Sequence, residues 1–392
     1  MISIPEAISI VKKHSEPLLK NTTKQVEKAG GYLLFEDVTS PINMPPFRQS
    51  AMDGYALHLH EDLNYNLIGE VKAGDSHQPV LKKGEAVRIF TGAAVPDSAN
   101  AVMMQEKVIK TENHITLEQQ GTIQQNIRPL GEQVKTGDIA LKAGTKLTPA
   151  AIGYLMSLGI TKVSVFKKPN IAIVTTGNEL IEAGQDLAFG KIYESNSKML
   201  LSALYSLKFY DVTLYKVDDN YTKTIETLNT AINDKDLVLI TGGISVGDYD
   251  FVGKALNQLQ VEEHFYKVKQ KPGKPLFYGK KNNTQIFALP GNPAAALSCF
   301  YVYVYIALQK LMNRDVLELP RIEANSISSF KKKGDRPQFL KAIYNTGTVE
   351  ILEGQNSSML QTFALSNALV YAPETVTEIN KGDTIEVIQL PV

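Results

Sequence analysis

The sequence predicts an α/β multidomain fold with a doubly wound parallel-sheet domain, an inserted β-rich domain, a split helical and linker domain, and a C-terminal β barrel. Two patterns lead to this prediction. Between residues 169 and 319, apolar strand-like segments alternate with helical segments, which is typical of a parallel sheet with helices on both faces. Short strand-like segments broken by glycine fill residues 66–145 and return after Pro320.

The split domain is expected because two helices flank the β-rich segments. Apolar residues at helical spacing predict a helix within the first forty residues, and Gly30 and Gly31 end it. A second helix is predicted over 148–160, with Pro149 near its start. We expect it to pack on the first helix, so that the β-rich domain is inserted between them. The expected domains are residues 1–45 with 146–168, residues 46–145, residues 169–319 and residues 320–392.

Composition excludes several classes of protein. Lys and Arg balance Asp and Glu at 41 each, so the overall charge predicts no affinity for nucleic acid. The single cysteine, Cys299, excludes an internal disulfide framework and lies in an apolar stretch, where a buried thiol is a better interpretation than a nucleophile. The first residues lack a signal-peptide pattern, and no apolar run is long enough to span a membrane. We therefore expect a cytoplasmic protein with no membrane partner.

Three loops with glycine or hydroxyl residues are predicted to meet at the carboxyl edge of the parallel sheet. They cover residues 175–179, 241–248 and 289–293, and each follows a strand-like segment. The third leads into a helix for which Asn292 is the predicted N-cap and Pro293 the first residue. Free backbone amides at such an edge, together with the positive helix end, predict an anion-binding site.

A run of lysines follows in "YKVKQKPGKPLFYG", which contains Lys267, Lys269, Lys271 and Lys274. Lysines on a solvated strand edge would produce the same pattern, because they discourage aggregation. However, the Pro-Gly pair between Lys271 and Lys274 fixes the backbone, so both ammonium groups can point to one place. We expect them to bind a phosphate or a small oxyanion.

Acidic residues also end several strands. An exposed acid in a loop is usually solvated or caps a helix, and this is the favoured interpretation of Asp219 and Asp248. Carboxylates close to a bound phosphate, however, require a cation between them. Mg²⁺ held by one or two carboxylates and by phosphate oxygens is the usual solution, which makes Glu179, Asp218 and Asp250 candidate ligands.

Taken together, the motifs resemble the molybdopterin molybdenumtransferase family, which includes MoeA and the E domain of gephyrin. The resemblance extends over nearly the whole chain and includes "SAMDGYA", "RIFTGAAVP", "TGGISVGDYDF", "KPGKPLFYG" and "LPGNPAAAL". The order of "SAMDGYA", "KPGKP" and "LPGNP" is highly specific. One departure is Ala295, since many relatives carry serine there.

The resemblance implies roles for individual residues. Catalytic positions of the family fall on Asp53, Thr91, Glu179, Asp218, Asp250, Lys267 and Lys271. Positions that bind the substrate or the oxyanion fall on Lys274, Pro290, Pro293, Arg336 and Ser357. The three sheet-edge loops add further candidate binding residues, namely Thr176, Gly177, Gly242, Gly243, Ser245, Gly247, Gly291 and Asn292. Glu179, Asp218 and Asp250 are the implied Mg²⁺ ligands, with Asp219 as an alternative to Asp218.

The implied reaction takes molybdate and adenylylated molybdopterin, releases AMP and gives molybdenum cofactor. A homodimer is implied, with each site between the α/β domain of one subunit and the linker and β-rich domain of its partner. Molybdopterin adenylyltransferase and molybdoenzyme apoproteins are further expected partners. Two alternatives remain: adenylyltransferase activity, which needs neither the inserted β-rich domain nor the barrel, and a scaffold that anchors a receptor.

Overall fold

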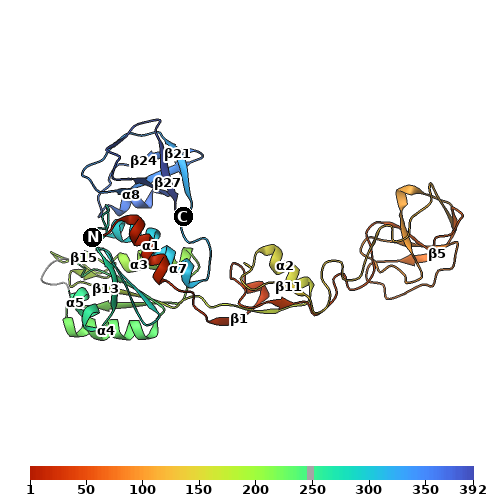
Figure 1. Cartoon of the computed structure of the whole chain (residues 1–392), viewed down its shortest axis with the longest axis horizontal. Coiled ribbons are helices and arrows are strands. Elements are labelled where there is room, and N and C mark those ends of the chain that lie inside the picture. Colours follow the sequence, from red (N-terminus) through yellow and green to blue (C-terminus); the bar gives the residue numbers. More distant parts are fainter. Residues whose placement is uncertain (245–250) are drawn as a thin grey trace. The chain divides into compact units, whose positions relative to one another are not determined.

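The computed structural model describes residues 1–244 and 251–392 of the chain (Figure 1). These residues form two compact units. One unit contains Met1–Lys20 and Phe166–Val392, and the other contains Asn21–Val165. The larger unit is called the sheet–barrel unit below, and the smaller one is called the insert.

A mixed sheet is the centre of the sheet–barrel unit. Its strand order is β16-β13-β17-β20-β19-β18. The strands are β13 (Ile171–Thr176), β16 (Val212–Val217), β17 (Leu237–Thr241), β18 (Glu262–Tyr266), β19 (Phe277–Lys281) and β20 (Thr284–Leu289). The first four strands in this order are parallel, as predicted, whereas β19 and β18 continue the sheet as antiparallel strands that the sequence reasoning did not foresee.

Helices cover both faces of this sheet, so it is doubly wound as predicted (Figure 1). One face packs against α1 (Ile4–His14), α3 (Asn196–Ser206) and a continuous helical run. That run consists of α6 (Pro293–Cys299), the π-helical turn η3 (Phe300–Val304) and α7 (Tyr305–Leu311). The other face packs against α4 (Tyr221–Asp234) and α5 (Phe251–Gln258). Alternate residues of the central strands serve the two faces: Ile171 and Ile173 join one core, while Ala172 and Val174 join the other.

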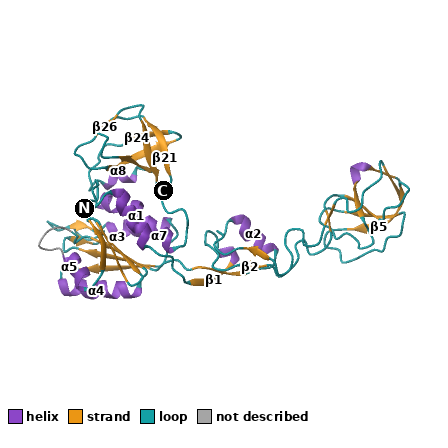
Figure 2. Ribbon diagram, viewed as in Figure 1, coloured by secondary structure: helices purple, strands orange, loops and turns teal. Residues whose placement is uncertain are grey.

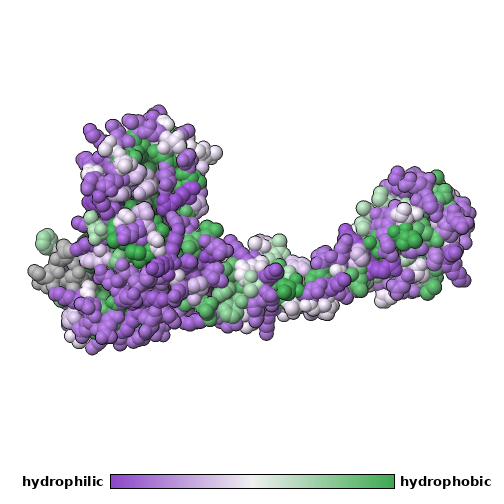
Figure 3. All heavy atoms as spheres, viewed as in Figure 1, coloured by the Kyte–Doolittle hydropathy of each residue, from purple (hydrophilic) through white to green (hydrophobic). Residues whose placement is uncertain are grey.

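The α4 helix packs on the sheet through one apolar side, as its amphipathic sequence predicts. Its buried residues are Thr224, Leu228, Ala231 and Ile232, which recur at helical spacing. The surface beneath the sheet, where α4 lies, is mostly hydrophilic in Figure 3. The run Pro293–Leu311 is instead apolar all round and is long enough by composition to cross a membrane, but 89% of its most apolar window is buried inside the protein. Such burial is typical of a core helix.

The N-terminal helix α1 packs on α7 and η3. Its first turn is fixed by a capping box between Ser3 and Glu6, and its apolar residues Ile4, Ala7 and Val11 are buried against the sheet–barrel core. The prediction that α1 packs on the helix over 148–160 is therefore wrong. That helix, α2 (Pro149–Ser157), packs on the short helix η1 (Val26–Lys28) inside the insert.

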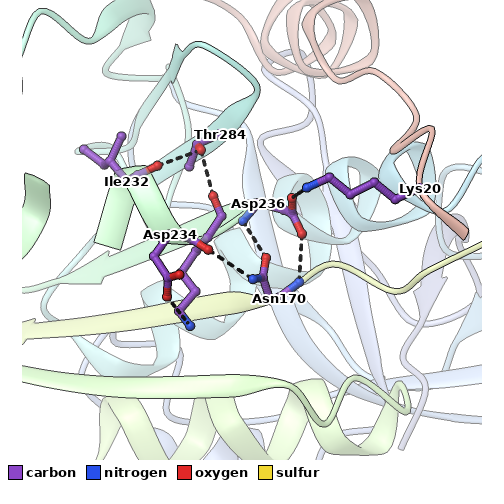
Figure 4. A network of polar contacts seen from close by, with 7 residues as sticks. Lys20, Asn170, Ile232, Asp234, Asp236 and Thr284 are labelled. Atoms are coloured by element: carbon purple, nitrogen blue, oxygen red, sulfur yellow. Dashed lines mark hydrogen bonds and ion pairs between the residues drawn. The ribbon is translucent and has the colours of Figure 1, made fainter. Parts of the chain in front are cut away.

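A polar network secures the amino-terminal edge of the sheet (Figure 4). The buried Asp236 carboxylate accepts hydrogen bonds from Lys20 Nζ at 2.9 Å and from the Asn170 backbone nitrogen at 3.0 Å. The Asn170 side chain accepts one from the Asp236 backbone nitrogen at 3.0 Å. Thr284 Oγ1 donates to the Ile232 carbonyl at 2.8 Å, which ties the start of β20 to α4. This edge is thus occupied by structural bonds.

The C-terminal residues form the predicted barrel (Figure 2). It is closed in the order β21-β24-β23-β25-β27. Its strands are β21 (Arg321–Ser326), β23 (Gln338–Asn345), β24 (Thr348–Ile351), β25 (Ala368–Ala372) and β27 (Thr384–Gln389). A small sheet pairs β22 (Phe330–Lys331) with β26 (Glu378–Ile379), and α8 (Leu360–Ala364) packs on α6. The barrel closes because β21 pairs with both β24 and β27.

The insert is β-rich, as predicted. Its main sheet has the order β7-β4-β6-β5-β9-β8. These strands are β4 (Gly54–Leu57), β5 (Asn64–Val71), β6 (Glu85–Ile89), β7 (Ala101–Met104), β8 (Val108–Lys110) and β9 (His114–Leu117). The short helix η2 (Gln105–Lys107) lies between β7 and β8. Smaller strand pairs are β1 (Asn21–Gln25) with β12 (Lys162–Phe166), β2 (Val38–Thr39) with β11 (Ile139–Leu141), and β3 (Gln49–Ser50) with β10 (Ile127–Arg128). The predicted division of this region into residues 46–145 and the flanking parts of the split domain stays a prediction.

Candidate active site

A cavity of about 690 Å³ lies at the carboxyl edge of the parallel strands. The strand order places β16 on one side of β13 and β17 on the other, so the chain reverses its direction of winding at β13. Ligands of open α/β sheets bind where this reversal occurs, because the loops after the two neighbouring strands separate there. The cavity is lined by Thr175 and Thr176 at the end of β13 and by Glu179 in the loop that follows, and also by Thr241 at the end of β17 and by Gly242 after it.

Many of the residues predicted from the sequence meet in this cavity. The predicted residues that line it are Thr176, Glu179, Gly242, Lys271, Lys274, Pro290, Gly291, Asn292, Pro293, Arg336 and Ser357. Lys267 and Asp218 are not among its lining residues. Ser245, Gly247, Asp248 and Asp250 lie outside the described residues. Asp53 and Thr91 belong to the insert and are considered separately.

The part of the cavity lined by Thr176 and Gly242, which we call its sheet-edge end, depends on close backbone contact between the end of β13 and the loop after β17. Gly242 has φ +89°, and a Cβ there would lie 2.4 Å from the Thr176 carbonyl oxygen. At Gly243, with φ +61°, a Cβ would lie 2.7 Å from Thr176 Oγ1. A side chain at either position would both strain the backbone and clash, so glycine is required for this approach. Thr176 Oγ1 is buried and has no hydrogen-bond partner among the described residues.

Asn196 joins the loops at this end, and the sequence reasoning missed it. Its Nδ2 donates to Thr241 Oγ1 at 2.7 Å and to the Gly291 carbonyl at 2.8 Å. The Ser-Asn-Ser run at the start of α3 was the available signal, because such residues cluster where helices begin near a ligand edge. The Asn196 side chain therefore connects the end of β17 to the loop after β20.

Glu179 supplies a carboxylate to the sheet-edge end. It folds back on Gly177, where a Cβ would lie 2.7 Å from Glu179 Oε2. Gly177 has φ +139°, so the loop relies on glycine for both space and conformation. Among the described residues no group of three or more His, Cys, Asp or Glu side chains could hold a metal ion. The predicted ligand set also contains Asp250, which lies outside the described residues.

Asp218 and Asp219 are used differently. The Asp219 carboxylate accepts from the Asn178 backbone nitrogen at 3.1 Å, and the Asp219 backbone nitrogen donates to Asn178 Oδ1 at 2.9 Å. Asp219 is thereby committed to holding two loops together. The Asp218 carboxylate lies 3.8 Å from Lys223 Nζ, with both side chains largely exposed, so this ion pair is weak. Of the two acids, Asp218 is the one whose carboxylate remains accessible to a ligand.

Basic residues line another part of the cavity, which we call its basic end. Lys271 and Lys274 both line it, as the Pro-Gly pair between them predicts. Lys271 pairs with the barrel, because its backbone nitrogen donates to the Pro337 carbonyl and its carbonyl accepts from the Phe339 nitrogen, each at 2.9 Å. Arg336 Nη1 donates to the Gln270 carbonyl at 3.1 Å. The barrel therefore contributes a guanidinium beside the two ammonium groups, and this end of the cavity suits an oxyanion.

The start of α6 corrects one prediction. Its first amides were expected to be free for an anion, but the Ala294 and Ala295 nitrogens donate to the Ser357 carbonyl at 3.1 Å and 3.3 Å. Asn292 is the N-cap residue by position, yet its side chain makes no capping bond and Nδ2 donates to Ser357 Oγ at 2.9 Å. The expectation of free amides is wrong, because a loop from the barrel domain already occupies them. Ser357 is fixed against α6 as a result.

Lys267 lies apart from the cavity wall. Its Nζ is 4.7 Å from the centroid of the Tyr266 ring, a cation–π arrangement. Its backbone nitrogen donates to the Leu276 carbonyl at 3.0 Å. A catalytic role for Lys267 stays a prediction.

In the insert, Asp53 and Thr91 form a close pair. The Thr91 backbone nitrogen and Oγ1 both donate to Asp53 Oδ1, each at 2.7 Å. These bonds lower the pKa of Asp53 below its ordinary value, with a smaller contribution from the charge of Arg88. Asp53 is therefore an ionised carboxylate with its second oxygen available, and Thr91 holds it in place.

Comparison with known proteins identifies the family. The MoeA N-terminal region (domains I and II) matches residues 2–159, the probable molybdopterin binding domain matches residues 172–310, and the MoeA C-terminal region (domain IV) matches residues 324–390. A molybdopterin molybdenumtransferase from Staphylococcus epidermidis is 33% identical over 401 residues, covering 99% of this chain and 95% of the relative. The chain belongs to the molybdopterin molybdenumtransferase family. A family member from Haemophilus influenzae is 34% identical and covers 92% of each chain.

Solved structures agree with this assignment. The molybdopterin biosynthesis MoeA protein from Pyrococcus horikoshii OT3 superposes with a TM-score of 0.83 at 30% identity, covering 99% of this chain and 100% of that one. The predicted α/β multidomain fold is thereby confirmed as the fold of the molybdopterin molybdenumtransferase family. The N-terminal match contains Asp53 and Thr91, and the C-terminal match contains Arg336 and Ser357.

Proposed function

We propose that this chain inserts molybdate into adenylylated molybdopterin with Mg²⁺-dependent release of AMP, giving molybdenum cofactor. The observation that carries the proposal is one cavity with two chemically different ends. The basic end brings Lys271, Lys274 and Arg336 together and suits a tetrahedral dianion. The sheet-edge end offers glycine backbone and Glu179, which suits a phosphoanhydride with its cation.

The reaction has two parts whose atoms balance. Water adds to the phosphoanhydride, and AMP leaves while molybdopterin keeps its own phosphate. Molybdate then exchanges one oxygen for the two dithiolene sulfurs, and that oxygen leaves with the two thiol protons as water. Lys271, Lys274 and Arg336 would neutralise molybdate, and Ser357 would orient it by a hydroxyl contact. Such catalysis consists mainly of positioning and charge neutralisation.

We propose that a magnesium ion binds at the sheet-edge end. Glu179 places a carboxylate there, and Mg²⁺ takes one or two carboxylates together with phosphate oxygens. Glu179, with the predicted Asp218 and Asp250, would hold the ion, which when bound would neutralise the phosphoanhydride oxygens. The Glu179→Gln variant should raise the Mg²⁺ concentration needed for half-maximal binding of AMP. An unchanged Mg²⁺ requirement would remove Glu179 from the ligand set.

The barrel supports this function over the adenylyltransferase alternative. Arg336, Asn356 and Ser357 reach the cavity from the barrel domain, so without that domain the basic end would lack its guanidinium and its serine hydroxyl. Adenylyl transfer alone gives no reason for an oxyanion pocket of this kind. The accessible acids and lysines likewise argue against a purely scaffolding role.

The decisive experiment incubates the protein with adenylylated molybdopterin, molybdate and Mg²⁺, and it measures AMP release and active cofactor. Both should require molybdate. If neither depends on molybdate, the proposed transferase function is wrong.

We also propose that the protein is a cytoplasmic homodimer in which Asp53 and Thr91 orient the substrate of the partner subunit. Molybdopterin adenylyltransferase would deliver the substrate, and molybdoenzyme apoproteins would accept the product. Mixing an Asp53→Asn variant with a Lys271→Met variant tests the shared site, because a mixed dimer would contain one intact combination of both residues. Activity should return to about a quarter of the wild-type value for random mixing of subunits in a twofold dimer. Two variants that remain inactive when mixed, although they exchange subunits, would show that Asp53 and Lys271 do not serve a shared site.

A further inference from the structure

Lys341 is a buried lysine that the proposed reaction does not use. It lies on β23, between Leu340 and Ala342 of the barrel core, so its side chain points away from that core. The residue is 4% exposed. Its Nζ donates to three backbone carbonyls, those of Gly354 at 2.7 Å, Asn356 at 3.1 Å and Met359 at 3.0 Å. All three donor positions of the ammonium group are thereby used.

The backbone of Lys341 holds the same segment. Its nitrogen donates to Gln355 Oε1 at 2.9 Å, and its carbonyl accepts from Gln355 Nε2 at 2.9 Å. Gln355 Nε2 also lies 2.7 Å from the Leu352 carbonyl. The segment between β24 and α8, residues 352–359, is therefore folded around Lys341. We call it the Ser357 loop.

The Ser357 loop is a wall of the basic end of the cavity. Asn356 and Ser357 both line the cavity. The Ser357 carbonyl accepts from the first amides of α6, and Ser357 Oγ accepts from Asn292. A continuous series of hydrogen bonds thus runs from the Lys341 ammonium through the loop backbone to Ser357 and the start of α6.

We propose that Lys341 is a positioning residue for oxyanion binding, acting through Asn356 and Ser357 without contacting the ligand. This inference rests on the proposed function, because it assumes that the basic end binds molybdate. Burial lowers the pKa of Lys341 from its ordinary 10.5 to about 8, so its charge is maintained at a cost. An apolar side chain of similar length would avoid that cost but would remove the ammonium donor from three carbonyls of the loop, of which the Asn356 carbonyl would keep a bond from the Met359 nitrogen.

A second buried lysine provides a matched control. Lys332 is 8% exposed, and its Nζ donates to the carbonyls of Pro373 and Glu374 at 2.6 Å and 3.0 Å. Neither acceptor lines the cavity. Replacing either lysine by methionine removes a buried ammonium bound to backbone carbonyls of the same domain. Lys341 alone of this pair is bonded to the Ser357 loop.

The test measures molybdate binding to the full-length protein by equilibrium dialysis. Lys341→Met should weaken binding by about tenfold, the scale expected when a residue that orients a binding group is lost. Lys332→Met should bind within about twofold of wild type, because distant sites act independently. In a Ser357→Ala background, Lys341→Met should weaken binding little further. Additive losses in the double variant, or wild-type affinity in Lys341→Met, would overturn the proposal.

Hydrogen exchange separates this inference from the proposed function. The amides of Ala294 and Ala295 should exchange faster in Lys341→Met than in Lys332→Met, since they depend on the position of the Ser357 carbonyl. If wild-type protein binds no molybdate, the proposed function fails, and unchanged exchange of these two amides would overturn the positioning role as well. If Lys341→Met does not fold, Gln355→Leu replaces it, because it disturbs the same loop and leaves the buried ammonium in place.

Discussion

The two ends of the cavity are built in contrasting ways. At the sheet-edge end, Gly242 and Thr176 meet through their backbones, and their positions follow from the order of the strands. At the basic end, Lys271, Arg336 and Ser357 come from three separate segments, held together by bonds between the barrel domain and the sheet domain. Shape at the first end is a local property of two loops. Charge at the second end depends on how the barrel docks.

The largest expected effect is at the sheet-edge end. Gly242→Ala should lower the free energy of unfolding by about 3 kcal/mol, because it combines a left-handed backbone with a Cβ clash. Gly291→Ala is the matched control: Gly291 does not have a positive φ, and its Cβ would lie 3.8 Å from Gly242 Cα, an ordinary contact. Denaturant unfolding of both variants measures the difference. Equal losses would mean that close backbone approach does not define this end.

The next effect is at the basic end and concerns binding. Arg336→Met should weaken molybdate binding by about thirtyfold, since a hydrogen bond to a charged group contributes about 2 kcal/mol. Binding of AMP, which we assign to the sheet-edge end, should stay unchanged. Lys281→Met, at the end of β19, is the control for loss of a positive charge. Calorimetric titration with each ligand tests the separation. A parallel loss of AMP affinity would show that the two ends do not act separately.

The sequence could predict the first end far better than the second. A strand followed by glycine indicates a ligand edge, so Thr176, Gly242 and Gly291 were identified from local pattern. Asn196 was missed because its importance comes from acceptors on two other loops. Free amides at α6 were wrongly expected, since nothing local shows that the Ser357 carbonyl arrives from the barrel. Long-range docking is the part that one sequence did not reveal.

Lys341 gives the basic end an unusual pH dependence. Its folded pKa of about 8 lies below its ordinary 10.5, so between these values the unfolded chain holds more protons. Stability should therefore rise with pH in this window, by linkage. Molybdate binding should fall in the same window, because a neutral amine has too few donors for the Gly354, Asn356 and Met359 carbonyls.

Melting temperatures and molybdate affinities, measured between pH 7 and pH 10, test whether stability rises while molybdate binding weakens. Lys341→Met provides the baseline, since it removes this titration and leaves those of the other lysines. The difference in molybdate affinity between the wild type and Lys341→Met should become smaller as the pH rises. A constant difference in both quantities would contradict the role of the Lys341 proton.

The smallest expected effect compares two buried hydroxyls at the sheet edge. Thr241 Oγ1 accepts a hydrogen bond from Asn196 Nδ2, so Thr241→Val should cost about 1 kcal/mol of unfolding free energy. Thr176 Oγ1 is buried without a partner among the described residues, so Thr176→Val should be neutral or stabilise the protein by up to about 1 kcal/mol. Denaturant unfolding at pH 7 measures both. If Thr176→Val were the more damaging change, the Thr176 hydroxyl would be a structural group rather than one available to a ligand.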